Sequence, residues 1–285
     1  MVSDMLDRTD PIQLKEHLRS LDIWSKKRLG QHFLIDSKVL DQIIQASAVG
    51  SNDTVVEIGP GPGVLTERLL SRVKRLIAFE FDPHMLRLLR ADFPNLELIE
   101  GDILQTAHQE IPELDSYHIV ANIPYQITTP LLKLFLEGGI EPRPLSMTLL
   151  VQKEVGKRLT AGARQPNRGY LSVLCQYFAE MTYVTTVLKT AFWPAPEVDS
   201  AVLHFKLRPT RAFSGEQEKE FLRFVRSRFI QPRKQLKNVI AGIQGVEQTE
   251  VVPYLLSLGL KESVRAQELS QEEWQKLYLQ PFNPL

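Results

Sequence analysis

The fold is decided by the stretch VVEIGPGPG at residues 55–63. A short apolar run ends there in glycines, and Val64–Arg72 follows with a helical pattern. Glycines between a strand and a helix let a ligand approach the backbone, and the first helical turn presents unpaired N–H groups. The spacing is neither the G-x-G-x-x-G of dinucleotide sites nor the G-K-[ST] of a phosphate loop. The stretch therefore predicts a turn that receives a ligand without phosphates, unless it is only a tight turn.

Short β-rich runs alternate with helical stretches around and beyond these glycines. We expect strands at Thr54–Ile58, Arg75–Glu80, Leu96–Glu100 and His118–Ala121, helices at Val64–Arg72, Met85–Asp92 and Thr129–Glu137, and a further apolar run at Met147–Gln152. This alternation predicts an α/β fold, with a mostly parallel sheet and helices on both faces.

The pattern changes in the last hundred or so residues. Two β-branched segments, Tyr177–Val187 and Ser200–Leu207, flank the loop Lys189–Val198, which predicts a terminal antiparallel hairpin. Only helical patterns follow, at Glu216–Ile230, Arg233–Ile240, Glu250–Leu258 and Gln271–Leu279. We therefore expect a sheet domain over residues 26–209 and a small all-α domain over 210–285. Residues 1–25, with a helix near Ile12–Ser20, form an N-terminal extension.

Composition excludes several classes of protein. The chain has 285 residues, of which 43% are hydrophobic and 24% charged, so it can bury a full core. A single cysteine, Cys175, excludes a disulfide framework and any multi-thiolate metal site, and we expect no metal. We find neither a long apolar run nor a secretory signal, so we expect a cytoplasmic protein. The 34 basic and 34 acidic residues cancel, so any case for nucleic acid must rest on local clusters.

Two acidic residues follow strands beyond the glycine turn. Glu80 ends the second strand, where an acid can accept hydrogen bonds from ribose hydroxyls. Asp102 follows the third, where it could accept from an adenine amino group. Together with the glycines they describe a site for a nucleoside without phosphate, and S-adenosylmethionine is the obvious candidate. The alternatives are that Glu80 is a solvated acid whose role Asp82 takes, and that Asp102 is only a helix N-cap.

The stretch ANIPY at residues 121–125 follows the fourth strand. The N6 amine of adenine is a poor nucleophile because its lone pair is delocalised into the ring. The side-chain oxygen of Asn122 and the backbone carbonyl of Ile123 could accept its two hydrogens and orient the lone pair for attack on a sulfonium methyl. Tyr125 would offer an aromatic face to an extruded base. The alternative is an Asn-x-Pro turn with a core tyrosine.

With these motifs the chain resembles the ribosomal RNA adenine dimethyltransferase family. The resemblance rests on segments that occur in family order from about residue 26 to 240: KRLGQHFL at 27–34, EIGPGPG at 57–63, Gly101-Asp102, NIPY at 122–125, QKEV at 152–155, FWPAPEVDS at 192–200 and RKQLKN at 233–238. Two features depart from the family. Residues 1–25 are longer than its usual basic lead, and the neutral net charge is low for an RNA enzyme.

The resemblance implies a class I (Rossmann-like) methyltransferase sheet with a helical C-terminal domain. It implies contacts to the methyl donor from Gln31, His32, Leu34, Gly59, Gly61, Glu80, Asp102 and Asn122. It implies that Phe192 stacks on the target adenine opposite Tyr125. Family members methylate two adjacent adenosines near the 3′ end of small-subunit rRNA, each twice, so the implied partner is that rRNA within an immature 30S particle. We expect a monomer.

Local charge supports an RNA partner. One cluster, between Phe221 and Ile240, carries basic residues and no acidic one: Arg223, Arg226, Arg228, Arg233, Lys234 and Lys237. A second comprises Lys153, Lys157, Arg158, Arg164 and Arg168, and a third includes Lys27 and Arg28. Basic patches near a base-stacking site are the electrostatic signature of phosphate binding. The alternative for each patch is a solvated helix face.

Three other functions remain open at this point. A large-subunit rRNA methylase of the antibiotic-resistance type would share the catalytic core. The length and the RKQLKN motif at 233–238 favour a small-subunit enzyme instead. A DNA adenine methylase is disfavoured, because such enzymes usually carry an acid at the position of Asn122. A ribosome-assembly factor with secondary or lost catalysis should show degraded donor residues, and these are intact.

Overall fold

The computed structural model describes residues 6–23 and 31–283. The described chain forms two compact units. The first comprises Met1–Gly156 and Glu180–Leu207, and the second comprises Lys157–Ala179 and Arg208–Leu285. The chain passes into its last helices at residues 207–208, close to the expected boundary at 209. The second unit also takes in Lys157–Ala179, which the sequence pattern placed with the sheet.

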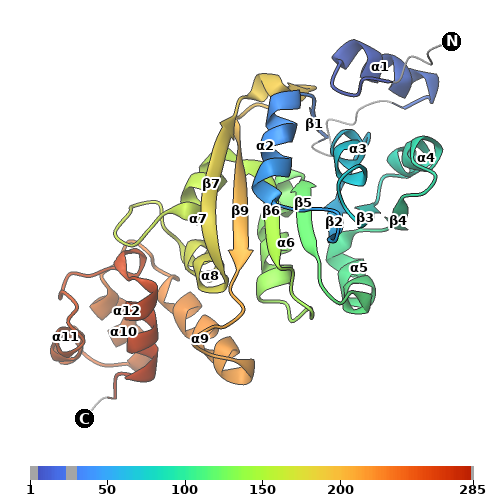
Figure 1. Ribbon diagram of the computed structural model, residues 1–285. Helices are drawn as coiled ribbons and strands as arrows, with labels where there is room; N and C mark the ends of the chain where they lie inside the picture. Colours follow the sequence, from blue (N-terminus) through green and yellow to red (C-terminus); the bar gives the residue numbers. More distant parts are fainter. Residues whose placement is uncertain (1–5, 24–30, 284–285) are drawn as a thin grey trace. The chain divides into compact units, whose positions relative to one another are not determined.

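A seven-stranded sheet organises the first unit, in the order β4-β3-β2-β5-β6-β9-β7 (Figure 1). Its strands are β2 (Thr54–Ile58), β3 (Arg75–Glu80), β4 (Glu97–Glu100), β5 (His118–Asn122), β6 (Ser146–Gln152), β7 (Ala179–Val187) and β9 (Ser200–Leu207). The first five run parallel, and β9 lies antiparallel to β6. This confirms the predicted fold class, a mostly parallel sheet that ends in an antiparallel part.

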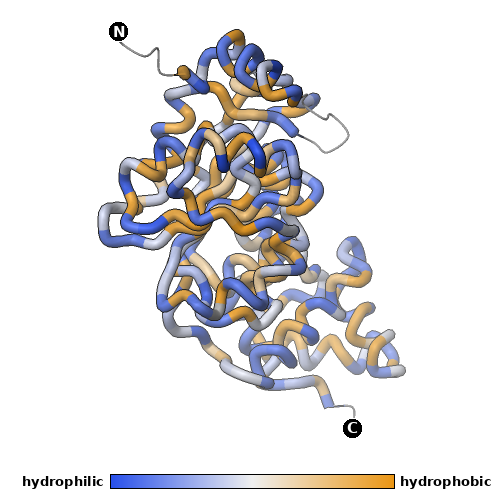
Figure 2. The backbone as a smooth tube through the Cα atoms, turned by 90° about the vertical axis from the view of Figure 1, so that its right-hand side faces the viewer, coloured by the Kyte–Doolittle hydropathy of each residue, from blue (hydrophilic) through white to orange (hydrophobic). Residues whose placement is uncertain are grey.

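The central strands are apolar on both faces because helices cover both. Val55 and Val56 of β2 and Ile119 and Val120 of β5 are fully buried. The helices of this unit are α1 (Pro11–Ser20), α2 (Ser37–Ser47), α3 (Val64–Leu70), α4 (Pro83–Asp92), α5 (Ile103–Glu110), α6 (Thr128–Leu136) and the start of α7 (Lys153–Thr160). Blue and orange alternate along many helical stretches in Figure 2, as expected for elements that bury one face.

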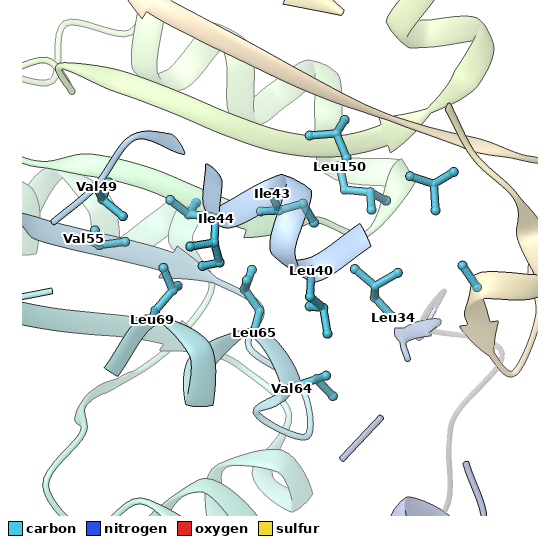
Figure 3. Packing of buried hydrophobic residues seen from close by; sticks show 14 of the residues in the cluster. Leu34, Leu40, Ile43, Ile44, Val49, Val55, Val64, Leu65, Leu69 and Leu150 are labelled. Carbon is cyan, nitrogen blue, oxygen red and sulfur yellow. The ribbon is translucent and has the colours of Figure 1, made fainter. Parts of the chain in front are cut away.

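One hydrophobic cluster joins α2 and α3 to the sheet. Figure 3 shows Leu40, Ile43 and Ile44 of α2 beside Leu65 and Leu69 of α3. The cluster continues onto a short antiparallel ribbon formed by β1 (Phe33–Leu34) and β8 (Phe192–Trp193), in which Leu34 pairs with Phe192. We call this ribbon the strap. It ties the segment before the sheet to the loop between β7 and β9.

The N-terminal helix α1 is part of the first unit rather than a free extension. Asp10 caps it by accepting hydrogen bonds from the backbone N–H groups of Ile12 and Gln13. Its apolar face buries Leu14 and Leu18 in a cluster with Met85, Leu88 and Leu89 of α4 and with Phe33.

The second unit is helical. It contains the end of α7, then α8 (Tyr170–Phe178), α9 (Gly215–Arg228), α10 (Leu236–Gln244), α11 (Gln248–Ser257) and α12 (Gln271–Leu279). Aromatic rings fill its core: Tyr177 and Phe213 lie 5.2 and 4.9 Å from Phe221, measured between ring centroids, and Trp274 is fully buried. Tyr278 packs edge-on against both Phe213 and Phe221.

Some helices and strand limits were not predicted from the sequence. The strand expected at Tyr177–Val187 begins only at Ala179, because Tyr177 and Phe178 end α8. Most residues of α8 are buried, so its sequence shows no amphipathic period. Helices α2, α5 and α7 were likewise not predicted. None of the helices in the described ranges is long and apolar enough to cross a membrane.

Candidate active site

The turn between β2 and α3, residues 59–63, depends on its glycines; we call it the donor turn. Gly61 and Gly63 have φ of 55° and 80°, a left-handed conformation that side chains disfavour. A Cβ on Gly61 would lie 3.3 Å from the Phe33 ring, and one on Gly63 only 2.3 Å from the Phe93 ring. The turn is therefore packed closely at Gly61 and Gly63, where its left-handed backbone favours glycine.

A cavity opens beside the donor turn. Its empty space is about 800 Å³, a figure that includes the part open to solvent. Its walls come from the strap, the donor turn and the ends of β3 and β5: Gln31, His32, Phe33, Leu34, Leu40, Glu57, Gly59, Pro60, Gly61, Pro62, Val64, Leu65, Glu80, Phe81, Asn122, Ile123, Pro124 and Tyr125. The carboxyl ends of neighbouring parallel strands thus meet at one crevice.

Glu80 lines this cavity. Its Oε1 accepts hydrogen bonds from the N–H groups of Phe81 and Asp82, both at 2.9 Å, and its Oε2 accepts from Gly61 at 3.2 Å. Burial raises the pKa of this carboxyl. Asp82 is engaged elsewhere: it caps α4 and accepts a hydrogen bond from Gln31 Nε2 at 2.8 Å. Of the two acids weighed for the ribose, Glu80 is therefore the one that lines the cavity.

Glu57 and Phe81 are among the wall residues that sequence reasoning did not predict. Glu57, within the donor-turn motif, is fully buried, and its Oε2 accepts a hydrogen bond from Thr66 Oγ1 at 2.7 Å. Burial raises the pKa of this carboxyl to about 8. Phe81 is 51% exposed, an unusual position for a large ring directly after a buried acid. An acid inside a strand's apolar run and an aromatic ring beside Glu80 were the available signals.

The ANIPY stretch places its polar groups at the end of β5. Asn122 Nδ2 donates to the backbone carbonyl of His32 at 3.2 Å, so the side-chain Oδ1 is the atom left to accept. Tyr125 packs its ring on that of His32, with centroids 6.3 Å apart, and its hydroxyl lies 2.6 Å from Ser200 Oγ. Burial raises the pKa of Tyr125. Asn122, Ile123 and Tyr125, three of the four predicted catalytic residues, therefore line the cavity together.

Two predicted residues lie outside the cavity wall. Asp102 caps α5, accepting from the Leu104 N–H at 3.0 Å; its predicted contact to the donor stays a prediction. Phe192 is only 4% exposed and belongs to the same hydrophobic cluster against which Tyr125 packs. His32 Nδ1 lies 2.8 Å from the Pro194 carbonyl, which fixes this end of the strap. The predicted RNA ligands Lys27 and Arg28 lie outside the described residues.

The predicted basic residues divide into three groups. Several already have intramolecular partners: Lys153 pairs with Asp199, Arg223 with Glu216 and Lys237 with Glu262. Arg158, Arg226, Arg233 and Lys234 are exposed.

Two further arginines of the basic clusters have structural roles instead. Arg168 is buried and donates to the Leu269 carbonyl and to Gln176, and Arg228 lies 3.6 Å above the Phe224 ring. Burial lowers the pKa of Arg228 to about 10. Within the described ranges no cluster of acidic, histidine or cysteine side chains could hold a metal ion.

The cavity fits a nucleoside methyl donor. A buried acid at the end of β3 can accept from ribose hydroxyls, and Gly59 and Gly61 line the cavity with it. Leu34 and Leu65 give the wall an apolar part for the rest of the ligand.

Comparisons with known proteins give the relatives of this chain. Residues 24–280 match the family model described as ribosomal RNA adenine dimethylase. Ribosomal RNA small subunit methyltransferase A of Dehalococcoides mccartyi is 39% identical over 272 residues, which cover 94% of this chain and 92% of the relative. Its Bacillus mycoides counterpart is 36% identical over 284 residues, 96% and 97% of the two chains.

Two solved structures share the fold. A dimethyladenosine transferase from Plasmodium falciparum superposes with a TM-score of 0.71 at 27% identity, covering 87% of this chain and 96% of the other. The 23S rRNA methyltransferase ErmE gives 0.68 at 25% identity, covering 87% and 98%. Since the family model and the relatives span almost the whole chain, it belongs to the ribosomal RNA adenine dimethylase family, methyltransferases that use S-adenosylmethionine.

Proposed function

We propose that this enzyme dimethylates the N6 amines of two adjacent adenosines near the 3′ end of small-subunit rRNA, in an immature 30S particle. The observation that carries the proposal is the meeting of Asn122, Ile123 and Tyr125 with Glu80 and the donor turn in one cavity. The relatives named small subunit methyltransferase A, at 36–39% identity over most of the chain, support this choice of RNA. Such a reaction belongs in the cytoplasm, where subunits mature, and one copy of the chain supplies the cavity.

The donor supplies an electrophilic methyl group on its sulfonium. Asn122 and Ile123 prepare the nucleophile. Asn122 Oδ1 accepts one N6 hydrogen, because its Nδ2 is held by the His32 carbonyl and the amide cannot turn over freely. The Ile123 carbonyl accepts the other, so the lone pair is oriented along the line of attack. Glu80 and the donor turn hold the donor's nucleoside, with Gln31, His32, Leu34 and Asp102 as further proposed contacts.

Tyr125 holds the target base in place. Its hydroxyl bond to Ser200 and its packing on His32 fix the ring before RNA arrives. A pre-oriented aromatic face reduces the entropic cost of capturing an extruded purine. Phe192 is proposed to cover the opposite face of the base. Because it is 4% exposed, this role requires the strap to move when RNA binds.

We propose that basic side chains bind the RNA phosphates. Arg158, Arg226, Arg233 and Lys234 present charge to solvent, and Lys27 and Arg28 complete the proposed set. Lys153, Arg223 and Lys237 would have to exchange an intramolecular carboxylate for a phosphate.

A second candidate is methylation of large-subunit rRNA. The observation in its favour is the fold shared with ErmE, at a TM-score of 0.68. The test offers labelled donor to unmethylated small subunits and to large-subunit precursors, and then maps the modified nucleosides. The proposal expects N6,N6-dimethyladenosine at two adjacent positions of the small subunit. Label confined to the large subunit would contradict it, and binding without transfer to either particle would favour an assembly factor.

A further inference from the structure

The proposed reaction leaves the N-terminal segment without a role, although this segment touches the donor turn. Arg8 is 6% exposed, and its side chain spans three partners. Nε donates to the Pro62 carbonyl at 3.2 Å, and the two terminal nitrogens bind Glu67 at 2.9 Å and Asp92 at 2.6 Å. We propose that Arg8 is a positioning residue for the methyl donor, holding the donor turn in its binding conformation.

Several contacts fix the position of Arg8. Helix α1 buries Leu14 and Leu18 against α4, which fixes the segment that carries Arg8. His17 Nε2 lies 2.7 Å from the same Asp92 oxygen that Arg8 contacts. The guanidinium also lies 4.6 Å from the centroid of the Phe93 ring. A buried arginine with paired carboxylates and a ring beneath it has one stable position.

The donor turn is thus held from two sides. On the cavity side Glu80 accepts from the Gly61 N–H, and on the other Arg8 donates to the carbonyl of Pro62, the next residue. Phe93, which contacts Arg8, also packs on Gly63. Glycines with left-handed φ lose much conformational freedom on ordering. An anchor that orders them in the free protein reduces what donor binding must overcome.

The test compares Arg8→Ala with wild type in the absence and presence of S-adenosylhomocysteine. Without ligand, amide hydrogen exchange at Gly59, Gly61 and Gly63 should accelerate in the variant. With ligand, calorimetry should show affinity weaker by about tenfold, the loss of roughly one charged hydrogen bond. Turnover at saturating donor should stay within about twofold, and the KM for RNA should not change. A purely structural role would lower turnover and RNA binding together.

Matched variants separate the loss of the Arg8 contacts from a folding defect. Asp92→Asn weakens the grip on Arg8 without touching the donor turn and should give a smaller change of the same kind. Arg8→Lys keeps the charge but cannot reach all three partners, so it should fall between. Lys15→Ala, on the exposed face of α1, is the control and should change nothing. If Arg8→Ala unfolds, exchange and donor affinity measured on Asp92→Asn and Arg8→Lys test the role of Arg8.

The inference rests on the proposed donor site, and the experiment separates the two. Wild-type protein that fails to bind S-adenosylhomocysteine would overturn the proposed site itself. Wild-type binding with unchanged exchange and affinity in the Arg8 variants would overturn only the role of Arg8.

Discussion

The cavity edge of the sheet and the helical unit both attracted functional predictions, and they use their polar side chains differently. At the cavity, backbone groups hold the key residues so that they face a ligand: three N–H groups fix Glu80, and the His32 carbonyl fixes Asn122. In the helical unit, Arg168 donates to the Leu269 carbonyl and Arg228 lies over the Phe224 ring, while Arg223 and Lys237 form ion pairs.

The difference concerns what a sequence pattern can specify. A motif of fixed spacing at a strand end constrains the backbone around it. Glu80, Asn122 and Tyr125 accordingly line one cavity, although the motif residues Asp102 and Phe192 do not. A count of charges on a helix does not say which are exposed, because long side chains bend toward any nearby acceptor. Motif residues are therefore the stronger functional prediction, and charge clusters the weaker. The following predictions test that contrast, beginning with the largest effect.

Removing the acceptor from the cavity should have the largest consequence. Asn122→Ala should lower the single-turnover rate of methyl transfer by roughly 10²–10³-fold, as expected for losing one preorganised group at the reacting centre. Donor affinity should stay within a few-fold, because Glu80 and the donor turn remain. Rapid-quench assays with labelled donor measure the rate. Asn95→Ala, an exposed turn residue, is the control, and turnover of Asn122→Ala near that of the control would refute the assignment.

The tyrosine face should matter less than the acceptor. Tyr125→Ala should weaken catalysis by about 5–100-fold through lost stacking of roughly 1–3 kcal/mol. Tyr125→Phe loses only the bond to Ser200 and should cost a few-fold. Steady-state kinetics on small subunits separate the two variants. Equal losses for both would mean that the hydroxyl matters and the ring does not.

The exposed basic side chains of the helical unit should each add to the electrostatic attraction for RNA. Replacing Arg226, Arg233 and Lys234 by alanine should weaken RNA binding by about tenfold and reduce the slope of log affinity against log salt by about 2. Filter binding over a salt series measures both. The matched control is the partnered pair Arg223→Ala with Lys237→Ala, from which we expect a smaller change in slope. A larger change in the control would invert the assignment.

Glu57 should give the smallest effect, on stability rather than on chemistry. Its carboxyl titrates near 4.5 when unfolded and about 8 when folded, so the folded state holds the extra proton between these values. The stability this supplies is present at low pH and is lost as pH rises through about 8. Between about pH 5 and pH 9 the wild type should lose roughly 5 °C more in Tm than Glu57→Gln.

Calorimetric melts across this range measure the difference. Glu16→Gln, at an exposed site on α1, should follow the wild type. Parallel curves for Glu57→Gln and wild type would show that Glu57 is not the group responsible.

Much of the sheet was predictable from sequence, and the reasons are local. β2 and β3 were predicted with their observed limits, because buried parallel strands are continuous apolar runs between turn residues. Helix α8 was missed because it is buried nearly all round, and no element was assigned to the residues of α2. The roles proposed for the cavity residues stay predictions.

Tertiary contacts explain why the site could not be predicted fully from the sequence. No pattern in the first 25 residues indicates that Arg8 reaches Pro62, since that contact spans more than fifty residues. The burial of Phe192 likewise depends on the pairing of β1 with β8, two strands of two residues each, too short to show a period.

The most direct test is a structure of the protein with S-adenosylhomocysteine and an unmethylated fragment from the 3′ end of small-subunit rRNA. The account predicts the adenosine ribose at Glu80 and a target adenine lying on Tyr125, its N6 within hydrogen-bond distance of Asn122 Oδ1 and the Ile123 carbonyl. An adenine bound away from Asn122, or a ligand that leaves the cavity beside the donor turn empty, would contradict it.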